Sequence, residues 1–373
     1  MRFSFVIPTY NNRKLLGNTL AVLNSLEGYG RNDFEVIIVD DGSTDGTGEF
    51  VGRLPVNYPL HYRYLKRDEN SCRARARNHG WKNASGEIII FIDSDILVRR
   101  NYLKEIDRCF NLDNNILVVG MRIHLSEKDT HKIISGESSP DNFYWDKDDF
   151  ESLDNRYYYC GKDSYNANAN MFPWTLVYSC NMVVMKKHLE KVNGFDEKFI
   201  AWGLEDNELG LALEQTGVHV VINSRIEVLH QYHGNRNDHF IPEEKKAGYN
   251  ANVEYLLAKH NLSLKIDRRF LKQVLNGEMG FFSFPSKYEI YTVDFKVPDN
   301  LQNVQEAIQI YLEKGKSMVI VNDYNEKTDI DLWIQLLGKQ GAAVRYFPVS
   351  KQIDLSRMKA YMDSKKMEGS PGG

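Results

Sequence analysis

The sequence has few cysteines and no long apolar run. Its four cysteines are spread over 373 residues without CxxC spacing, so neither a zinc cluster nor a disulfide framework is readable, and we expect reduced thiols. No apolar run approaches the roughly 20 residues that a membrane-spanning helix needs. The opening residues lack the apolar length and the cleavage site of a secretory signal. These absences predict a cytoplasmic location and leave peripheral membrane contact open.

The chain also lacks an excess of charge of either sign. Its 47 basic and 51 acidic residues give a net charge of −4, so there is no overall field to attract a polyanion, and nucleic acid is not an expected partner. At roughly 150 residues per domain, this length allows about two domains. With 42% apolar and 26% charged residues, the composition is that of an ordinary globular protein.

Short apolar runs of strand length open the sequence, at residues 3–7, 35–39, 62–65 and 87–92. Because these runs lack alternation of period two, we expect most of them to be buried on both faces of a parallel sheet. Helices are expected between them, over residues 12–26, 44–54 and 71–84. This order predicts a right-handed, doubly wound α/β sheet, in which ligands bind outside the carboxyl ends of the strands.

The rest of the chain divides into three stretches. Residues 122–173 are polar and rich in Asp and Tyr, and we expect a long excursion there, either a functional loop or a solvated insertion. Strands are then expected at 176–185, 219–222 and 226–230, with helices at 205–215 and 245–261. A second pattern predicts a small α/β domain, with strands 289–295, 318–321 and 343–347 and helices 301–313 and 330–337; a flexible tail is expected from residue 368.

Polar side chains collect where the predicted strands end. Pro8-Thr9-Tyr10-Asn11 follows the first strand, Asp40-Asp41 the second and Asp93-Ser94-Asp95 the fourth. Alternation along the strand places Asp93 and Asp95 on one side, where carboxylates suit Mg²⁺ or Mn²⁺ together with a diphosphate. Asp40 and Asp41 either form a turn and helix cap or accept the N–H of a uracil ring and the hydroxyls of ribose.

Basic side chains lie near the start of the helix expected at 71–84. Guanidinium groups and helix N-termini both favour phosphate oxygens. Arg73 and Arg77 are four residues apart and share a face of the helix. Arg75 points elsewhere, and we expect it to be solvated.

Two later groups have both a structural and a chemical interpretation. Glu205-Asp206 begins a helix, where carboxylates are favoured even without catalysis; the chemical interpretation makes one of them a general base. The preceding Trp202-Gly203 supplies an aromatic face for a sugar ring and a flexible link. His230 and His233 follow an apolar strand and are either structural or complete a metal site.

Six motifs occur in order along residues 1–235. They are Val6-Ile7-Pro8-Thr9-Tyr10-Asn11, Asp40-Asp41-Gly42-Ser43, Ala76-Arg77-Asn78, Gly86-Glu87 leading to Asp93-Ser94-Asp95, Asn193-Gly194-Phe195-Asp196, and Trp202-Gly203-Leu204-Glu205-Asp206. Together they resemble the family 2 glycosyltransferases of the GT-A fold, and residues 194–213 are similar to the C-terminal motif of galactosyltransferases. We therefore expect a GT-A domain with a Rossmann-like mixed sheet over residues 1–264, an accessory α/β domain over 265–366 and a tail over 367–373.

The resemblance implies a role for each motif. The nucleoside would be held by Thr9, Tyr10, Asp40 and Asp41, with Arg77 near uracil or diphosphate. Asp93 would face the ribose, and Asp95 would bind Mn²⁺ or Mg²⁺ with His230 or His233. Asp206 would be the base, and Glu205 would orient the acceptor. Of the two histidines, His230 is the preferred ligand. Ser179-Cys180-Asn181 stands where the family usually has Gly-Gly-Asn.

The implied reaction is an inverting transfer of a hexose or N-acetylhexosamine from a UDP-sugar. The acceptor stays open between a saccharide, a lipid-linked or natural-product hydroxyl, and a peptide side chain. A sugar nucleotidyltransferase would need a glycine-rich basic loop after the first strand, which is missing, and an aspartyl phosphatase would need Thr or Val where Ile96-Leu97 stands. A non-catalytic nucleotide-sugar-binding protein would not need the candidate base.

Overall fold

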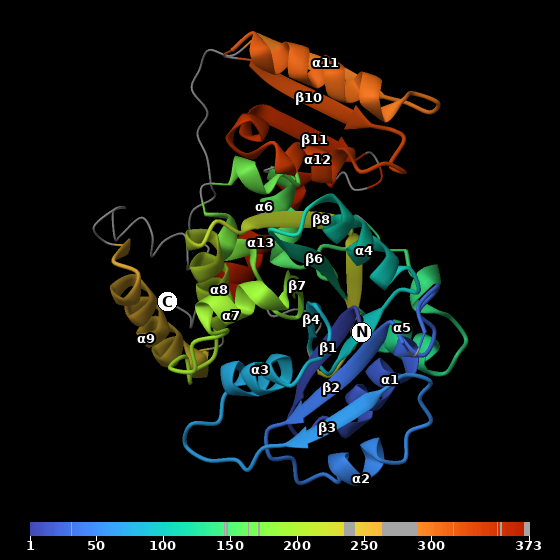
Figure 1. The fold of residues 1–373 in the computed structure, drawn as a ribbon, viewed down its shortest axis with the longest axis vertical. Coiled ribbons are helices and arrows are strands. Elements are labelled where there is room, and N and C mark those ends of the chain that lie inside the picture. Colours follow the sequence, from blue (N-terminus) through green and yellow to red (C-terminus); the bar gives the residue numbers. More distant parts are fainter. Residues whose placement is uncertain are drawn as a thin grey trace.

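Two β-sheets organise the chain (Figure 1). The computed structural model describes residues 1–234 except 31, 145, 147, 163 and 171, residues 243–262, and residues 289–368 except 316, 349, 351 and 352. An eight-stranded sheet has the order β3-β2-β1-β4-β7-β6-β8-β5, and a three-stranded sheet has the order β11-β10-β9.

The first part of the chain alternates strands and helices as predicted. Its elements are β1 (Phe3–Thr9), α1 (Arg13–Leu23), β2 (Phe34–Asp40), α2 (Thr47–Val51), β3 (Leu60–Tyr64), α3 (Arg73–Lys82) and β4 (Ile88–Ile92). These four strands pair in parallel. The expectation that most of these strands are buried on both faces is confirmed by β1, β2 and β4. Strand β3 is half-exposed because it lies at the edge of the sheet.

Alternate residues of the same strand contribute to two separate cores. In β1, Val6 belongs to the core on the α3 face, whereas Phe5 and Ile7 belong to the core on the α1 face. The first core includes Trp81 of α3, and the second includes Leu20 of α1. A strand covered by helices on both sides needs apolar residues at every position, which explains the continuous apolar runs in the sequence.

The middle of the chain turns the sheet into a mixed one. Its elements are β5 (Ile96–Val98), α4 (Tyr102–Leu112), β6 (Ile116–His124), α5 (Glu127–Ile134), α6 (Asn155–Lys162), β7 (Asn181–Met185), α7 (Lys186–Val192), α8 (Glu205–Gln215), β8 (His219–His230) and α9 (Glu243–Lys259). Strand β7 is antiparallel to β4 and β6, and β5 is antiparallel to β8. This is the Rossmann-like mixed sheet expected of the GT-A fold.

Three expectations for this region need correction. The excursion expected over 122–173 begins with the end of β6 and contains the helices α5 and α6, so it is not one continuous loop. The strand expected over 176–185 begins only at Asn181, because residues Pro173–Leu176 form a 3₁₀ turn. The two strands expected at 219–222 and 226–230 are one strand, β8, whose pairing with β6 shifts register at a bulge.

The second sheet follows the predicted order of elements. It comprises β9 (Glu289–Phe295), α11 (Leu301–Glu313), β10 (Ser317–Asp323), α12 (Ile330–Leu336) and β11 (Val344–Pro348), with all strands parallel. Helix α13 (Leu355–Glu368) packs against α6. It enters the segment expected as a tail, whose residues 369–373 lie outside the described residues. Within the described residues, no helix combines the length and apolar character needed to span a bilayer.

A buried glutamine joins the second sheet's helix α12 to β8. Gln335 is 2% exposed. Its Oε1 accepts hydrogen bonds from the backbone N–H groups of Ile222 at 2.7 Å and Ala167 at 3.3 Å, and its Nε2 donates to the Ile222 carbonyl at 2.8 Å. The side chain therefore satisfies backbone groups that would otherwise be buried without partners.

Arg225 also joins β8 to α12, through ion pairs. It lies in the bulge of β8, and its guanidinium reaches Asp329 Oδ1 at 3.1 Å and Asp331 Oδ1 at 3.3 Å, at the start of α12, and Glu105 Oε2 of α4 at 3.4 Å. Burial raises the pKa of Asp331 to about 6, although Arg225 opposes the rise. The C-terminal unit is thus attached to the large sheet by buried and partly buried polar contacts.

We predict that Gln335→Ala lowers the free energy of unfolding by about 2 kcal/mol, because it leaves buried N–H groups of β8 and Ala167 without acceptors. Urea unfolding followed by circular dichroism measures the change. The matched control is Gln340→Ala, at an exposed position just after the same helix, which should change stability by less than about 0.5 kcal/mol. Equal stability of the two variants would contradict this role for Gln335.

Candidate active site

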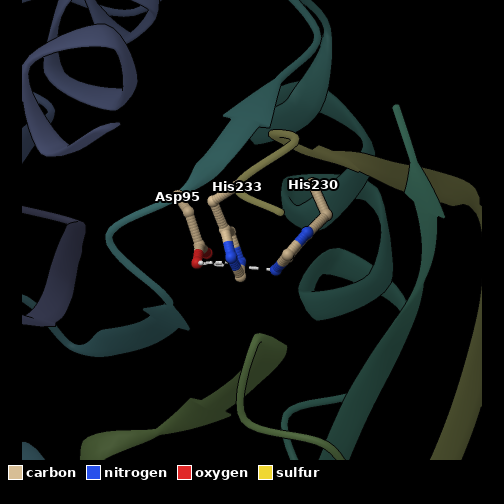
Figure 2. Close-up of side chains that lie close together, drawn as sticks. All are labelled: Asp95, His230 and His233. Atoms are coloured by element: carbon tan, nitrogen blue, oxygen red, sulfur yellow. Dashed lines mark ion pairs between the residues drawn. The ribbon is translucent and has the colours of Figure 1, made fainter. Parts of the chain in front are cut away.

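Three side chains that could ligate a metal meet at the carboxyl edge of the large sheet. Asp95, His230 and His233 each offer one ligand atom, and these atoms all lie within 4.8 Å of one another. Figure 2 shows the two imidazoles pointing toward the Asp95 carboxylate, with Nε2 atoms 3.5 Å and 3.6 Å from Oδ2. His230 is 13% exposed and His233 45%. Burial alone would raise the pKa of Asp95, but the two histidines hold it below its usual value.

The backbone around this cluster is fixed by strand pairing and by α1. Strand β5 pairs with the end of β8 so that Ile96 lies opposite His230, and the Gln231 N–H donates to the Asp95 carbonyl at 3.0 Å. Ser94 accepts a hydrogen bond from Asn12 at 2.8 Å. Segments more than 130 residues apart in sequence therefore meet in one place.

The side chains predicted to hold a nucleoside lie along the ends of β1 and β2. Asp40 accepts hydrogen bonds from the Ser43 N–H at 2.7 Å and from Tyr62 Oη at 2.6 Å. Asp41 Oδ2 binds Arg67 at 2.8 Å, and burial raises the pKa of Asp41 although Arg67 opposes the rise. The Asp41 Oδ1 and Thr9 Oγ1 atoms are buried and have no hydrogen-bond partner in the described part of the chain.

The residues that follow β1 differ in whether their side chains are available to contact a ligand. Tyr10 is 46% exposed, and the Arg67 guanidinium lies over its ring at 4.1 Å. Asn11 instead ties the two strand ends together, because its N–H donates to Ser43 Oγ at 2.8 Å and its Oδ1 accepts from the Thr44 N–H at 2.8 Å. Asp40 and Asn11 thus have clear structural roles, whereas Asp41, Thr9 and Tyr10 keep groups available. Pro8 lies within β1, opposite Val39 of β2.

Arg77 joins the end of β4, which leads to Asp93, to the start of α8, which carries Glu205. It is 2% exposed, and its guanidinium donates to Asp93 Oδ1 and to Glu205 Oε1, each at 3.1 Å. Burial alone would lower the pKa of Arg77, but the charges of Asp93 and Glu205 hold it above its usual value. Arg77 therefore stays charged where it bridges the end of β4 and the start of α8.

The other arginines of α3 have different surroundings. Arg73 is exposed, so sharing a helix face with Arg77 does not give it the same environment. Arg75 forms an ion pair with Asp68 at 2.6 Å and is only 27% exposed, in contrast to the expected solvated position. Helix α3 begins at Arg73, whose side chain is exposed, and packs against β1 and β2.

Asp206 lies in the first turn of α8 with its carboxylate held at both oxygens. Oδ2 accepts hydrogen bonds from the Ser179 N–H at 3.0 Å and Ser179 Oγ at 3.3 Å, and Oδ1 accepts from the Asn207 N–H at 3.0 Å. Burial and the neighbouring Glu205 raise the pKa of Asp206 to about 6. A carboxylate with this pKa is well matched to accepting a proton near neutral pH.

Helix α9 positions the turn that leads to these carboxylates. Asn252 donates to the carbonyls of Ala201 at 3.1 Å and Gly203 at 2.7 Å. Gly203 has φ +96°, and a Cβ there would lie 2.9 Å from the Tyr249 ring. Tyr249 also lies 6.1 Å from the Trp202 ring. Sequence reasoning missed Tyr249 and Asn252, because a helix in the next segment gives no local sign of the turn it supports.

Asn78 explains two of the sequence motifs at once. Its Nδ2 donates to the Phe195 carbonyl and to Glu197 Oε1, each at 2.8 Å, and its Oδ1 accepts from the Phe195 N–H at 2.9 Å. Gly194 has φ +71°, and a Cβ there would lie 2.4 Å from Asn78 Oδ1. The Arg77-Asn78 and Asn193-Gly194-Phe195-Asp196 motifs are therefore two sides of one contact that docks α7 and α8 onto α3.

Asn181 has a similar structural role. Its Oδ1 accepts from Tyr102 Oη at 2.8 Å, and its Nδ2 donates to the carbonyls of Met121 at 3.0 Å and Ile226 at 2.9 Å. The Asn of the Ser179-Cys180-Asn181 segment thus links β6, β7 and the bulge of β8.

Family models match the part of the chain that builds this site. Residues 4–176 match the model described as glycosyl transferase family 2, and residues 164–234 match the model described as the N-terminal domain of galactosyltransferase. These matches support a family 2 glycosyltransferase, and the chain is a glycosyltransferase enzyme. The nucleotidyltransferase, phosphatase and non-catalytic alternatives are thereby set aside.

Individual relatives agree with this assignment. The chain is 26% identical to an uncharacterized glycosyltransferase of Bacillus subtilis, YfnE, over 87% of this chain and 82% of that protein. It is 28% identical to validoxylamine A glucosyltransferase of Streptomyces hygroscopicus subsp. jinggangensis, over 59% and 53%, and 28% identical to chondroitin synthase of Escherichia coli, over 73% and 41%. The chain thus spans about half or less of these last two proteins.

Among solved structures, the S. aureus TarS 1–349 complex with UDP is 16% identical with a TM-score of 0.49, covering 99% of this chain and 92% of that chain.

We predict that Arg77→Met lowers the free energy of unfolding by about 3 kcal/mol, because it leaves two carboxylates near a buried site without their cation. Denaturant unfolding at neutral pH measures the change. Arg73→Met, on the exposed first turn of the same helix, is the matched control and should be nearly neutral. If both variants unfold at the wild-type denaturant concentration, Arg77 does not hold the two halves of the site together.

Proposed function

We propose that this protein is a metal-dependent, inverting glycosyltransferase that moves a hexose or N-acetylhexosamine from a UDP-sugar to a hydroxyl acceptor. The observation that carries the proposal is the pairing of two features at one sheet edge. One is the Asp95, His230 and His233 cluster, and the other is Asp206, whose pKa is raised to about 6. Arg77 links the two through Asp93 and Glu205.

The side chains of the cluster fit a divalent cation. Asp95 Oδ1 is buried without a hydrogen-bond partner among the described residues, and such an atom is costly unless something binds it. One carboxylate with two imidazoles is a mixed oxygen and nitrogen donor set that suits Mn²⁺. When bound, the ion would neutralise charge on the departing diphosphate. His230 is the more buried of the two histidines and lies on a paired strand, which favours it as the ligand over His233.

The nucleoside of the donor would lie on the β1 and β2 side of the site. Asp41 Oδ1 and Thr9 Oγ1 are buried groups without described partners, and they could accept the N3–H of uracil and bind a ribose or base oxygen. The exposed ring of Tyr10 offers a surface for stacking. Asp93 and Ser94 continue this edge toward Asp95, where the ribose and diphosphate would follow, and Arg73 stands exposed at the start of α3.

The chemical step needs one bond to form and one to break. The acceptor oxygen attacks the anomeric carbon from the face opposite the diphosphate, while the bond from that carbon to the diphosphate oxygen breaks and UDP leaves. Asp206 takes the proton of the acceptor hydroxyl as a general base. Ser179 and the Asn207 N–H hold that carboxylate in place, and Glu205, fixed by Arg77, would orient the acceptor. Trp202 offers an aromatic face beside them.

The relatives' names describe transfers to different acceptors. One is named as a validoxylamine A glucosyltransferase, and another as a poly(ribitol-phosphate) N-acetylglucosaminyltransferase that is 35% identical over 28% of this chain. They support a glucose-type or N-acetylglucosamine-type donor sugar in this chain, and they leave the acceptor open between a saccharide and another hydroxyl compound. Residues 243–262 and 289–368 lie beyond both family matches.

We predict that Mn²⁺ binding depends on Asp95 and on His230 more than on His233. Calorimetric titration of Mn²⁺ in the presence of UDP should show affinity falling by about tenfold or more in Asp95→Ala and His230→Ala. His233→Ala should have a smaller effect, because this side chain is nearly half-exposed. EDTA should abolish transfer. Wild-type Mn²⁺ affinity in Asp95→Ala would overturn the proposed metal site.

We predict that the rate of transfer falls as the pH drops through about 6, because the raised pKa of Asp206 means that the base becomes protonated there. The measurement is kcat/KM for UDP release against pH. Asp206→Asn keeps the shape but removes the base, so it should lose roughly 10² to 10⁴ in rate and still bind UDP. Transfer by this variant at near the wild-type rate would contradict the assignment of Asp206.

A further inference from the structure

A buried cluster of two arginines and one aspartate lies beside the site, and no sequence motif pointed to it. Asp154 binds Arg156 through both oxygens: Oδ1 accepts from Nε at 3.2 Å and Oδ2 from Nη2 at 3.0 Å. Arg122 approaches the same Oδ2 with its Nε at 3.1 Å. Two guanidinium groups share one carboxylate, so the cluster retains one positive charge.

Arg122 is the member of the cluster that stays available. Its Nε has no aligned hydrogen bond within the described residues. The side chain of Arg122 is 22% exposed, whereas those of Arg156 and Asp154 are 0% and 1% exposed. The Arg156 guanidinium is covered by the Tyr178 ring at 4.4 Å. Arg122 is therefore the one cation of the cluster that can meet a ligand.

The position of Arg122 on β6 places it between the His230 side of the site and the Ser179 side that holds Asp206. Arg122 lies opposite Val228 of β8, two positions before the pair of His124 with His230. On one side of Arg122, the His124 and His230 rings lie 4.9 Å apart. On the other side, Asn181 Nδ2 donates to the carbonyl of Met121, the residue before Arg122, at 3.0 Å. Burial raises the pKa of Cys180, and Arg122 is the largest charge that opposes the rise. Cys180 directly follows Ser179, which holds Asp206.

We propose that Arg122 donates hydrogen bonds to the hydroxyl oxygens of the sugar carried by the donor. This inference rests on the proposed function, which places the anomeric carbon between the diphosphate at Asp95 and the base Asp206. Arg122 lies near both the diphosphate side and the Asp206 side of the site, and the donor sugar would bind between these two sides. A planar guanidinium with several N–H donors suits adjacent sugar hydroxyls.

Asp154 and Arg156 then act as positioning residues for Arg122. The Asp154 carboxylate forms an ion pair with Arg122, with 3.1 Å between Oδ2 and Nε. Because Arg156 is fixed by two hydrogen bonds to Asp154 and by the Tyr178 ring, this support is rigid. Rigid support reduces the entropy lost when the sugar binds.

The test separates contacts to the sugar from contacts to UDP. The full chain with Mn²⁺ is assayed for slow hydrolysis of UDP-glucose and UDP-N-acetylglucosamine, and UDP is measured as an inhibitor. In Arg122→Ala, kcat/KM for hydrolysis of the preferred donor should fall by about tenfold or more, while the inhibition constant of UDP stays within about twofold of the wild-type value. Arg53→Ala, at an exposed position just after α2, is the control and should change neither value.

Arg122→Lys provides a second variant that keeps the charge and loses the planar fork, and its thermal unfolding is checked alongside. It should also lower kcat/KM with the UDP constant unchanged, and the ratio of rates for the two donors should shift. If the UDP constant rises by the same factor as kcat/KM falls, or if neither changes in Arg122→Lys, Arg122 does not bind the sugar. A wild-type protein that hydrolyses no UDP-sugar and binds no UDP would instead overturn the proposed function.

Discussion

The site depends on one buried cation shared between two carboxylates. Arg77 binds Asp93 at the end of β4 and Glu205 at the start of α8, each at 3.1 Å. A buried guanidinium is tolerated only when it is paired, so the fold must hold the strand end and the helix start against it. That requirement places the strand end that carries Asp93 and Asp95, the leaving-group side in our proposal, beside the helix that carries Asp206. Asn78, the next residue, binds the backbone of Phe195 in the connection between α7 and α8.

A second constraint is the long strand β8, which connects the site to the C-terminal unit. One end of β8 presents His230 to Asp95, and its bulge presents Arg225 to α12. Gln335 binds the backbone of the same strand at Ile222. The C-terminal unit therefore supports a strand that carries a candidate metal ligand. Its polar contacts with β8 are buried, so detaching it would leave charges and backbone groups without partners.

Much of the fold could be predicted because its signals are local. The continuous apolar runs of β1, β2 and β4 reflect burial on both faces, and the elements of the second sheet follow the predicted order. Elements were missed where the local pattern was weak: β5 is three residues long, and α5 and α6 lie within a polar stretch. The merging of two expected strands into β8 also escaped prediction, because a bulge interrupts the pattern but not the strand.

The sequence by itself determined which polar groups stand at strand ends, since the motifs from Thr9 to Asp95 directly follow apolar runs. These motifs were sufficient to indicate the resemblance to family 2 glycosyltransferases. Only the tertiary structure decided what those groups contact. It turned Arg77 inward and left Arg73 exposed, gathered His230 and His233 around Asp95, and supplied Asn252 and Arg122 from segments without a motif. The physical reason is that periodicity records which face of an element is buried, whereas partners across the sheet depend on strand order and register, which no local pattern contains.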